Sequence, residues 1–161
     1  MGASRVIAPP ARWVERLGRA CGDEGLATAQ ALAVVWMVRA ALGRVPFETL
    51  GAAVARLGRR RRRIEPIRGA AGARRIERIE RVVRGVNRAS RRVRGATCLT
   101  RALAVQALLG FTGVSSLVRY GVGRDANGGF RAHAWVECDG RVIIGGGEDM
   151  NGLVALSAQQ C

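Results

Sequence analysis

The sequence contains no lysine, so arginine supplies all 27 of its basic side chains. The 12 acidic residues leave a formal net charge of +15. Arginine keeps its charge and binds carboxylates and phosphates through paired hydrogen bonds, which a lysine cannot do. The charge therefore favours acidic partners, although genomic base composition explains the absence of lysine equally well.

Aromatic residues are also scarce, at 4% of the chain, whereas hydrophobic residues make up 48%. A core built from Ala, Leu, Val and Ile is therefore expected, and a length of 161 residues suits one domain of ordinary size. Proteins that bind single-stranded nucleic acids stack bases on aromatic rings. The shortage of rings argues against that class of function.

Three further patterns are missing. Residues 1–10 lack the basic-then-apolar order of a secretory signal. The longest apolar run, 31–38, is far shorter than the ~20 residues of a membrane span. No CxxC pair occurs among the four cysteines, which are Cys21, Cys98, Cys138 and Cys161. We expect a reduced, cytoplasmic protein with no zinc or other metal, no cofactor and no membrane span.

Apolar periodicity predicts helices first and strands later, which is typical of an α+β fold. The expected helices cover residues 12–20, 26–42, 47–57, 73–93 and 98–109. The expected strands cover residues 116–122, 132–138, 141–145 and 153–156. Residues 65–72 are expected to form a linker. We therefore predict a helical N-terminal region, 1–73, and a second region, 74–161. The five arginines at 59–63 are either a solvated segment or a binding site for a ligand or partner.

Asp139 and Gly140 form the strongest short hairpin signal in the chain. A two-residue turn there pairs Cys138 with Arg141. Continuing the register sets Trp135 opposite Ile144 and His133 opposite Gly146. A group that orients His133 should therefore lie near residues 145–149.

Cys98 and His133 are the residue pair with the clearest chemistry. Thr97 is a plausible N-cap, which puts Cys98 in the first turn of a helix, where the helix dipole favours a thiolate. Its backbone N–H is one candidate oxyanion donor. His133 is the only histidine, and an imidazole beside a thiol is a general base. A buried core cysteine and a structural histidine are the alternative reading.

The group that orients His133 has three candidates. Glu148 shares the face of His133 if the strand continues, and Asp149 follows it. Asp139 lies six positions away along the strand, roughly 20 Å, and its role in the turn already accounts for it. We favour Glu148, then Asp149. Arg101 either holds a carboxylate or points to solvent, and Trp135 either shields the site or packs in the hairpin.

Three blocks, residues 98–109, 117–123 and 132–140, occur in an order and spacing that resemble the transglutaminase-like leader peptidases of lasso-peptide biosynthesis. The resemblance covers about residues 74–156. It implies a papain/transglutaminase-like cysteine protease core with Cys98 as nucleophile and His133 as general base. Relatives commonly carry an aspartate at the position that Gly145 occupies here, so the resemblance supplies no third member.

The resemblance also implies a biological role. Such enzymes remove the leader from a ribosomally made precursor peptide, and a partner ATP-dependent lasso cyclase then closes a macrolactam. Residues 1–73 are expected to be helical without strands, whereas fused leader-recognition domains contain strands. We therefore expect the split form, which relies on a separate leader-recognition protein, and the basic face would dock that protein or an acidic leader.

Three alternatives stay open. The chain could be a catalytically inactive scaffold that binds a cyclase or transporter, which the missing aspartate allows. It could be a basic nucleic-acid-binding module, which the charge and the arginine-rich helix support. An acyl transferase would use the same thioester chemistry on the same fold.

Overall fold

The computed structural model describes residues 22–60, 69–124, 127–147 and 150–160. Within these ranges four helices precede four strands, which confirms the predicted α+β class. The helices are α2 (Gly22–Leu42), α3 (Phe47–Arg60), α4 (Gly69–Ser90) and α5 (Cys98–Phe111). The strands are β1 (Leu117–Arg124), β2 (Phe130–Cys138), β3 (Arg141–Ile144) and β4 (Val154–Gln160). The predicted helix at 12–20 and the arginines at 61–63 lie outside the described residues.

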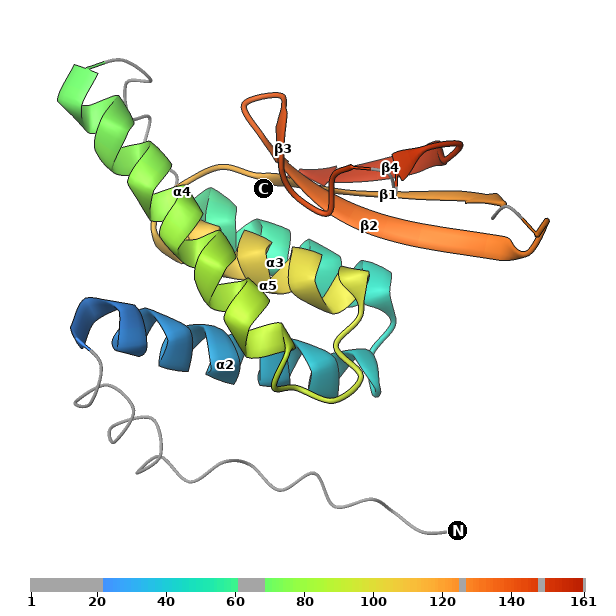
Figure 1. The fold of residues 1–161 in the computed structure, drawn as a ribbon, viewed down its shortest axis with the longest axis horizontal. Helices are drawn as coiled ribbons and strands as arrows, with labels where there is room; N and C mark the ends of the chain where they lie inside the picture. Colours follow the sequence, from blue (N-terminus) through green and yellow to red (C-terminus); the bar gives the residue numbers. More distant parts are fainter. Residues whose placement is uncertain (1–21, 61–68, 125–126, 148–149, 161) are drawn as a thin grey trace, which may run out of the picture.

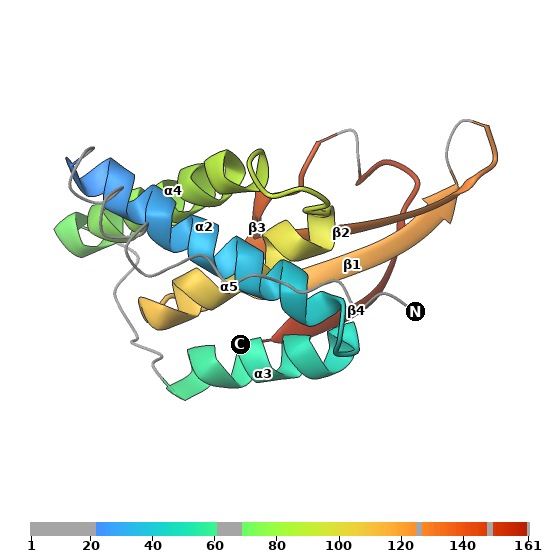
Figure 2. The same cartoon turned by 90° about the horizontal axis from the view of Figure 1, so that it is seen from below.

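The strands form one antiparallel sheet in the order β3-β2-β1-β4. The helices lie on one side of it, and the hairpin of β1 and β2 extends past them (Figure 1). Seen from below, α5 runs between α3 and α4 and begins close to β1 and β2 (Figure 2). The start of α5 therefore lies under the middle of the sheet.

The core is built around α5, which is apolar on nearly every side. Leu103, Val105 and Leu109 are completely or almost completely buried, and a helix that is apolar all round must be enclosed by other elements. The sheet contributes Val118 and Val136 to the same hydrophobic cluster, and α2 and α4 contribute further side chains. Strand alternation turns the helix-facing side chains of β1 and β2 onto α5.

Two arginines in α4 show how the helix layer is joined to the rest. Arg75 forms an ion pair with Asp139 in the β2–β3 turn, where it also donates to the Cys138 sulfur at 3.4 Å. Farther along α4, Arg81 pairs with Glu77 on the exposed surface. The first contact connects α4 to the sheet, whereas the second is a local i,i+4 pair of the kind that contributes little stability.

The predicted turn at Asp139 and Gly140 is confirmed, and both residues have positive φ, 51° and 73°, as a type I′ turn requires. Cys138 pairs with Arg141 as expected. A register shift between Val136 and Glu137 then pairs Val136 with Ile144. The predicted pairing of Trp135 with Ile144, and of His133 with Gly146, is therefore wrong. One extra residue in β3 produces the shift, and such a bulge leaves no mark in the alternation of hydrophobic residues.

The predicted linker at 65–72 is wrong at its C-terminal end, because α4 already begins at Gly69. Two glycines at 69 and 72 favoured a loop, but Gly72 is buried within the helix. The division of the chain at residue 73 stays a prediction.

One described helix is long and apolar enough to cross a membrane, the segment Gly25–Leu42 of α2. The uninterrupted apolar run at 31–38 is only part of this longer window, which the sequence-based prediction missed. In the structure Ala31, Val35 and Val38 of this helix belong to the hydrophobic cluster around α5, and 22% of the Gly25–Leu42 segment is buried. The absence of a membrane span stays a prediction.

Glu137 of β2 joins two neighbouring side chains. It accepts hydrogen bonds from Arg119 Nε at 2.8 Å and from Trp135 Nε1 at 3.0 Å. Partial burial raises the pKa of Glu137, but the bonds from Arg119 and Trp135 outweigh this effect, so its pKa lies below the ordinary 4.5. A depressed carboxyl pKa means that folding favours the ionised form.

This stabilisation should be present at neutral pH and disappear in acid. A carboxylate with a lowered folded-state pKa stabilises the fold above its unfolded-state pKa, and the effect is lost as the pH falls through the folded-state value. We expect Glu137→Gln to reduce the free energy of unfolding at about pH 6, by an amount that shrinks toward about pH 3. Urea unfolding across this range measures it.

The matched control is Glu77→Gln, which removes an exposed carboxylate from its pair with Arg81 and should change stability little. If the difference in the free energy of unfolding between wild type and Glu137→Gln stayed constant over the whole pH range, the lowered pKa assigned to Glu137 would be contradicted.

Candidate functional site

Cys98 is the first residue of α5, and the cap before it is well formed. The Thr97 side chain accepts from the Thr100 backbone N–H at 3.3 Å, and the Thr97 backbone N–H donates to the Thr100 hydroxyl at 3.3 Å. This reciprocal capping box confirms the predicted N-cap at Thr97. The role of Thr100 was missed, although its position three residues after Thr97 is the usual signal.

The capping box decides which backbone groups are left at this helix end. The N–H groups of the first turn have no partner within a helix, and the box uses those of Thr97 and Thr100. The N–H groups of Cys98 and Leu99 are therefore left without a partner within the helix. This helix end is where a negatively charged oxygen is best stabilised.

His133 lies near the middle of β2 and is half-buried. Its Nε2 atom is 2.9 Å from the carbonyl oxygen of Gly145, just past the end of β3. A carbonyl can only accept a hydrogen bond, so Nε2 is the donor in this contact, and in the neutral tautomer the lone pair is on Nδ1. The imidazole is therefore oriented by a backbone group.

Cys98 and His133 both line one pocket of about 300 Å³. Tyr120 and Val122 of β1, Ala132 and Ala134 of β2, and Leu156 of β4 form the sheet side of the wall, and Phe47 and Leu99 form the helix side. No charged side chain among the described residues lines it.

The two residues are not hydrogen-bonded to each other in the described structure. Catalytic hydrogen bonds are often long in the free enzyme and tighten on substrate binding. The geometric support for a functional Cys98–His133 pair is therefore that both residues line the same pocket.

The backbone at Gly145 explains why its carbonyl reaches His133. Gly145 has φ of 78°, and a Cβ atom there would lie 2.8 Å from the Ala134 carbonyl oxygen and 3.0 Å from Trp135 Cβ. Any side chain would push this segment away from β2. Glycine is thus required for the close approach, and the same approach brings the carbonyl within reach of the imidazole.

The structure describes only one of the three acidic residues that were candidates for orienting His133. Glu148 and Asp149 lie outside the described residues, so their roles stay predictions. Asp139 forms an ion pair with Arg75 in the turn at the end of β2. The described group that contacts the His133 ring is the Gly145 carbonyl, which sequence reasoning missed because a backbone atom leaves no residue-type signal.

Two other candidate residues have structural partners. Arg101 donates to Asn87 Oδ1 at 2.9 Å, so it neither holds a carboxylate nor simply points to solvent. Trp135 is 4% exposed and does not line the pocket, which agrees with hairpin packing.

Cys138 is also buried. Burial raises the pKa of its thiol, although Arg75 partly opposes this effect. Cys21 and Cys161 lie outside the described residues. Within the described ranges, no cluster of three His, Cys, Asp or Glu residues could hold a metal ion.

The comparisons with known proteins agree with this architecture. The family model Transglut_core3, described as the transglutaminase-like superfamily, matches residues 41–157. The match covers α3, α4, α5 and β1 to β3, so it includes both Cys98 and His133. No curated protein and no solved structure matches the chain.

The geometry fixes the tautomer of His133. We expect the neutral imidazole to carry its hydrogen on Nε2, because the Gly145 carbonyl accepts from that atom. Two-dimensional ¹⁵N–¹H NMR of the labelled imidazole distinguishes a protonated Nε2 from a protonated Nδ1. A neutral ring protonated on Nδ1 would contradict the described contact.

Adding a carboxylate at position 145 should destabilise the fold. Gly145→Asp forces a side chain into positive φ, which costs about 1–3 kcal/mol, and adds the clash with Ala134. Gly128→Asp is the matched control, because Gly128 also has φ of 78° but a Cβ atom there would meet no described atom within 4 Å. Thermal unfolding should show a larger loss for Gly145→Asp, and equal losses would show that the close approach does not exist.

Proposed function

The chain belongs to the transglutaminase-like superfamily, and we propose that it is a cysteine peptidase that removes the leader from a lasso-peptide precursor. Members of this superfamily are commonly cysteine peptidases or transglutaminases. The observation that carries the proposal is that Cys98, at a capped helix start, and His133 line the same apolar pocket.

The proposed reaction has two halves, formation and hydrolysis of a thioester on Cys98, and each half uses two proton transfers. His133 Nδ1 takes the thiol proton while Cys98 Sγ attacks the carbonyl carbon of the scissile peptide bond. The oxyanion faces the backbone N–H groups at the start of α5. The C–N bond then breaks, and His133 returns the proton to the leaving amine. A water molecule, deprotonated by His133, attacks the thioester, the C–S bond breaks, and the thiol is reprotonated.

The Gly145 carbonyl has the positioning role in this scheme. It accepts from Nε2 throughout and holds the ring so that Nδ1 can exchange a proton with Cys98. In Cys-His-Asp enzymes a carboxylate has this role. A carbonyl can orient the ring in the same way, although it brings no negative charge.

The pocket wall suggests what the enzyme accepts. Phe47 and Tyr120 meet edge to face, with ring centroids 5.4 Å apart, and Leu156 lies at the mouth with 57% of its surface exposed. A charged side chain would lose its hydration here without finding a partner. We therefore propose that the substrate presents an apolar side chain next to the cleaved bond.

The proposal extends to partners and location. As one partner we propose a separate leader-recognition protein that presents the precursor. The ATP-dependent lasso cyclase would use the trimmed precursor. These steps are proposed to take place in the cytoplasm, where thiols stay reduced.

The first test needs no precursor. At about pH 6 an unperturbed thiol is almost entirely protonated, so an activated Cys98 should react with iodoacetamide much faster than Cys138, which is buried. Peptide mass mapping compares wild type with His133→Ala, in which the rate at Cys98 should fall at least about tenfold. An unchanged labelling rate at Cys98 would show that His133 does not activate the thiol and would contradict the proposed pair.

The second test measures cleavage. Purified protein is incubated with a panel of lasso-peptide precursors and their leader-recognition proteins, and mass spectrometry detects the released leader. Cys98→Ala should reduce cleavage by about 10³-fold or more. Activated labelling without cleavage of any precursor would favour acyl transfer, whereas neither activity would favour an inactive scaffold.

Leu156→Asp tests the apolar wall. The substitution removes about 1.5–3 kcal/mol of apolar burial between Leu156 and the bound substrate. It should therefore lower kcat/KM for precursor cleavage by about 10–100-fold, mainly through KM. Val142→Asp is the control, because Val142 is also partly exposed on the sheet but does not line the pocket. Equal effects of the two substitutions would contradict the proposed subsite.

A further inference from the structure

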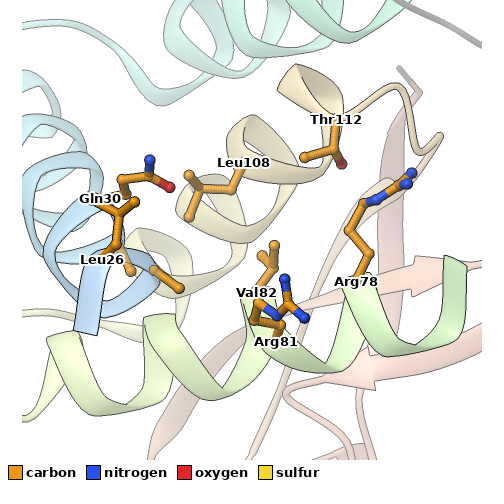
Figure 3. A pocket seen from close by; sticks show the side chains of 9 residues that line it. Leu26, Gln30, Arg78, Arg81, Val82, Leu108 and Thr112 are labelled. Atoms are coloured by element: carbon orange, nitrogen blue, oxygen red, sulfur yellow. The ribbon is translucent and has the colours of Figure 1, made fainter. Parts of the chain in front are cut away.

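A second cavity, of about 350 Å³, opens between α2, α4 and α5, away from the Cys98 pocket (Figure 3). Its α5 wall is made of Leu108 and Thr112, near the C-terminal end of the helix whose first residue is Cys98. The proposed chemistry does not use this cavity. We call it the arginine groove, after Arg78 and Arg81, which line it.

The groove exists because α2 and α4 approach closely at one point and diverge beyond it. At Gly85 a Cβ atom would be 3.4 Å from the Ala27 carbonyl oxygen and 3.4 Å from Ala31 Cβ. Arg78, Arg81 and Val82 lie on α4 one to two turns before that contact, on the same stripe of the helix. Figure 1 shows the two helices separating toward their N-terminal ends.

The lining combines two chemistries. Leu26, Val82 and Leu108 form an apolar surface, and Leu26 is 46% exposed. The guanidinium groups of Arg78 and Arg81 lie beside this surface in Figure 3. No acidic side chain and no aromatic ring among the described residues line the groove. Its ligand should therefore carry a carboxylate close to an apolar side chain.

The present partner of Arg81 does not close the site to such a ligand. Arg81 pairs with Glu77 at 2.9 Å, and the two side chains are 47% and 63% exposed. Exposed pairs of this kind contribute about 0–1 kcal/mol, so an incoming carboxylate can share or replace the contact. A bound carboxylate that is partly shielded by apolar groups would hold Arg81 more strongly.

We propose that the arginine groove docks an acidic, amphipathic peptide segment of a partner protein. The net charge of +15 would draw such a segment to this surface. The chain's own residues 1–21 suit the groove less well, because they contain four arginines and one glutamate. Nucleic acid is disfavoured because the lining is apolar between the arginines and its described residues offer no ring for stacking.

Fluorescence anisotropy tests the proposal with a defined probe. The probe is a fluorescein-labelled peptide of about 16 residues with Leu and Glu at i, i+3, i+4 spacing, and the control peptide has Ser in place of Leu. At about 0.1 M salt, we expect the Leu/Glu peptide to bind at least about tenfold more tightly than the Ser/Glu peptide. Equal binding, or no binding by either peptide, would overturn the proposal.

Matched variants locate the contact. The double variant Arg78→Glu/Arg81→Glu should weaken binding at least about tenfold. The control Arg91→Glu/Arg94→Glu makes the same charge change at two exposed arginines outside the groove and should weaken binding less than about threefold. Leu26→Ser should weaken it without changing charge. An equal loss of peptide affinity in both double variants would indicate non-specific electrostatic attraction and would overturn the proposed docking site.

Two further outcomes separate the alternatives. A random 20-nucleotide DNA should not displace the peptide at equal concentration, and displacement that depends on Arg78 and Arg81 would assign the groove to nucleic acid instead. Iodoacetamide labelling of Cys98 should be the same in all the groove variants that keep the wild-type melting temperature. The docking proposal and the peptidase proposal can therefore fail separately.

Discussion

The burial of α5 is the constraint on which the rest of the structure depends. Its side chains are apolar on almost every side, and Leu103, Ala104 and Val105 have 1% or less of their surface exposed. Such a helix is stable only when other elements enclose it, so α2, α3, α4 and the sheet are all arranged around it. Enclosure fixes the position of both ends of α5. The first residue, Cys98, is thereby held beneath the sheet.

A second constraint is the close approach of backbone segments that only glycine allows. At Gly145 the chain passes so near to β2 that a Cβ atom would overlap the Ala134 carbonyl oxygen. That approach puts the Gly145 carbonyl oxygen within 2.9 Å of the His133 ring. Orientation and charge are separate contributions of the third group in a catalytic triad. Among the described residues, the Gly145 carbonyl orients the His133 ring but brings no negative charge.

Local sequence signals predicted the parts of the fold that depend on local physics. Periodic apolar residues located α2 to α5 within a few residues, and Asp139-Gly140 located the hairpin turn. Thr97 was recognised as the cap of α5 because capping is a short-range hydrogen bond. The same reasoning placed the start of α4 too late, since Gly69 and Gly72 suggest a loop when the burial of Gly72 in the helix is unknown.

The features that sequence reasoning missed come from contacts between distant segments. The shift between Val136 and Glu137 changes the register by one residue, and hydrophobic alternation does not reveal it. The Gly145 carbonyl contacts His133 through a backbone atom that every residue type possesses. The divergence of α2 and α4 depends on how closely Gly85 approaches Ala27. None of these features has a residue pattern of its own, so each requires the three-dimensional arrangement.

The two ends of α5 also set a distance between the proposed chemistry and the proposed docking groove. Cys98 and Leu108 are ten residues apart on one helix, which corresponds to about 15 Å along its axis. An extended chain covers that length with about five residues, and a path around the helix layer needs several more. A partner held in the arginine groove could therefore present a flexible segment of about ten residues to Cys98. A rigid α5 keeps this spacing constant, so the length of the connecting segment would select which bond reaches the thiol.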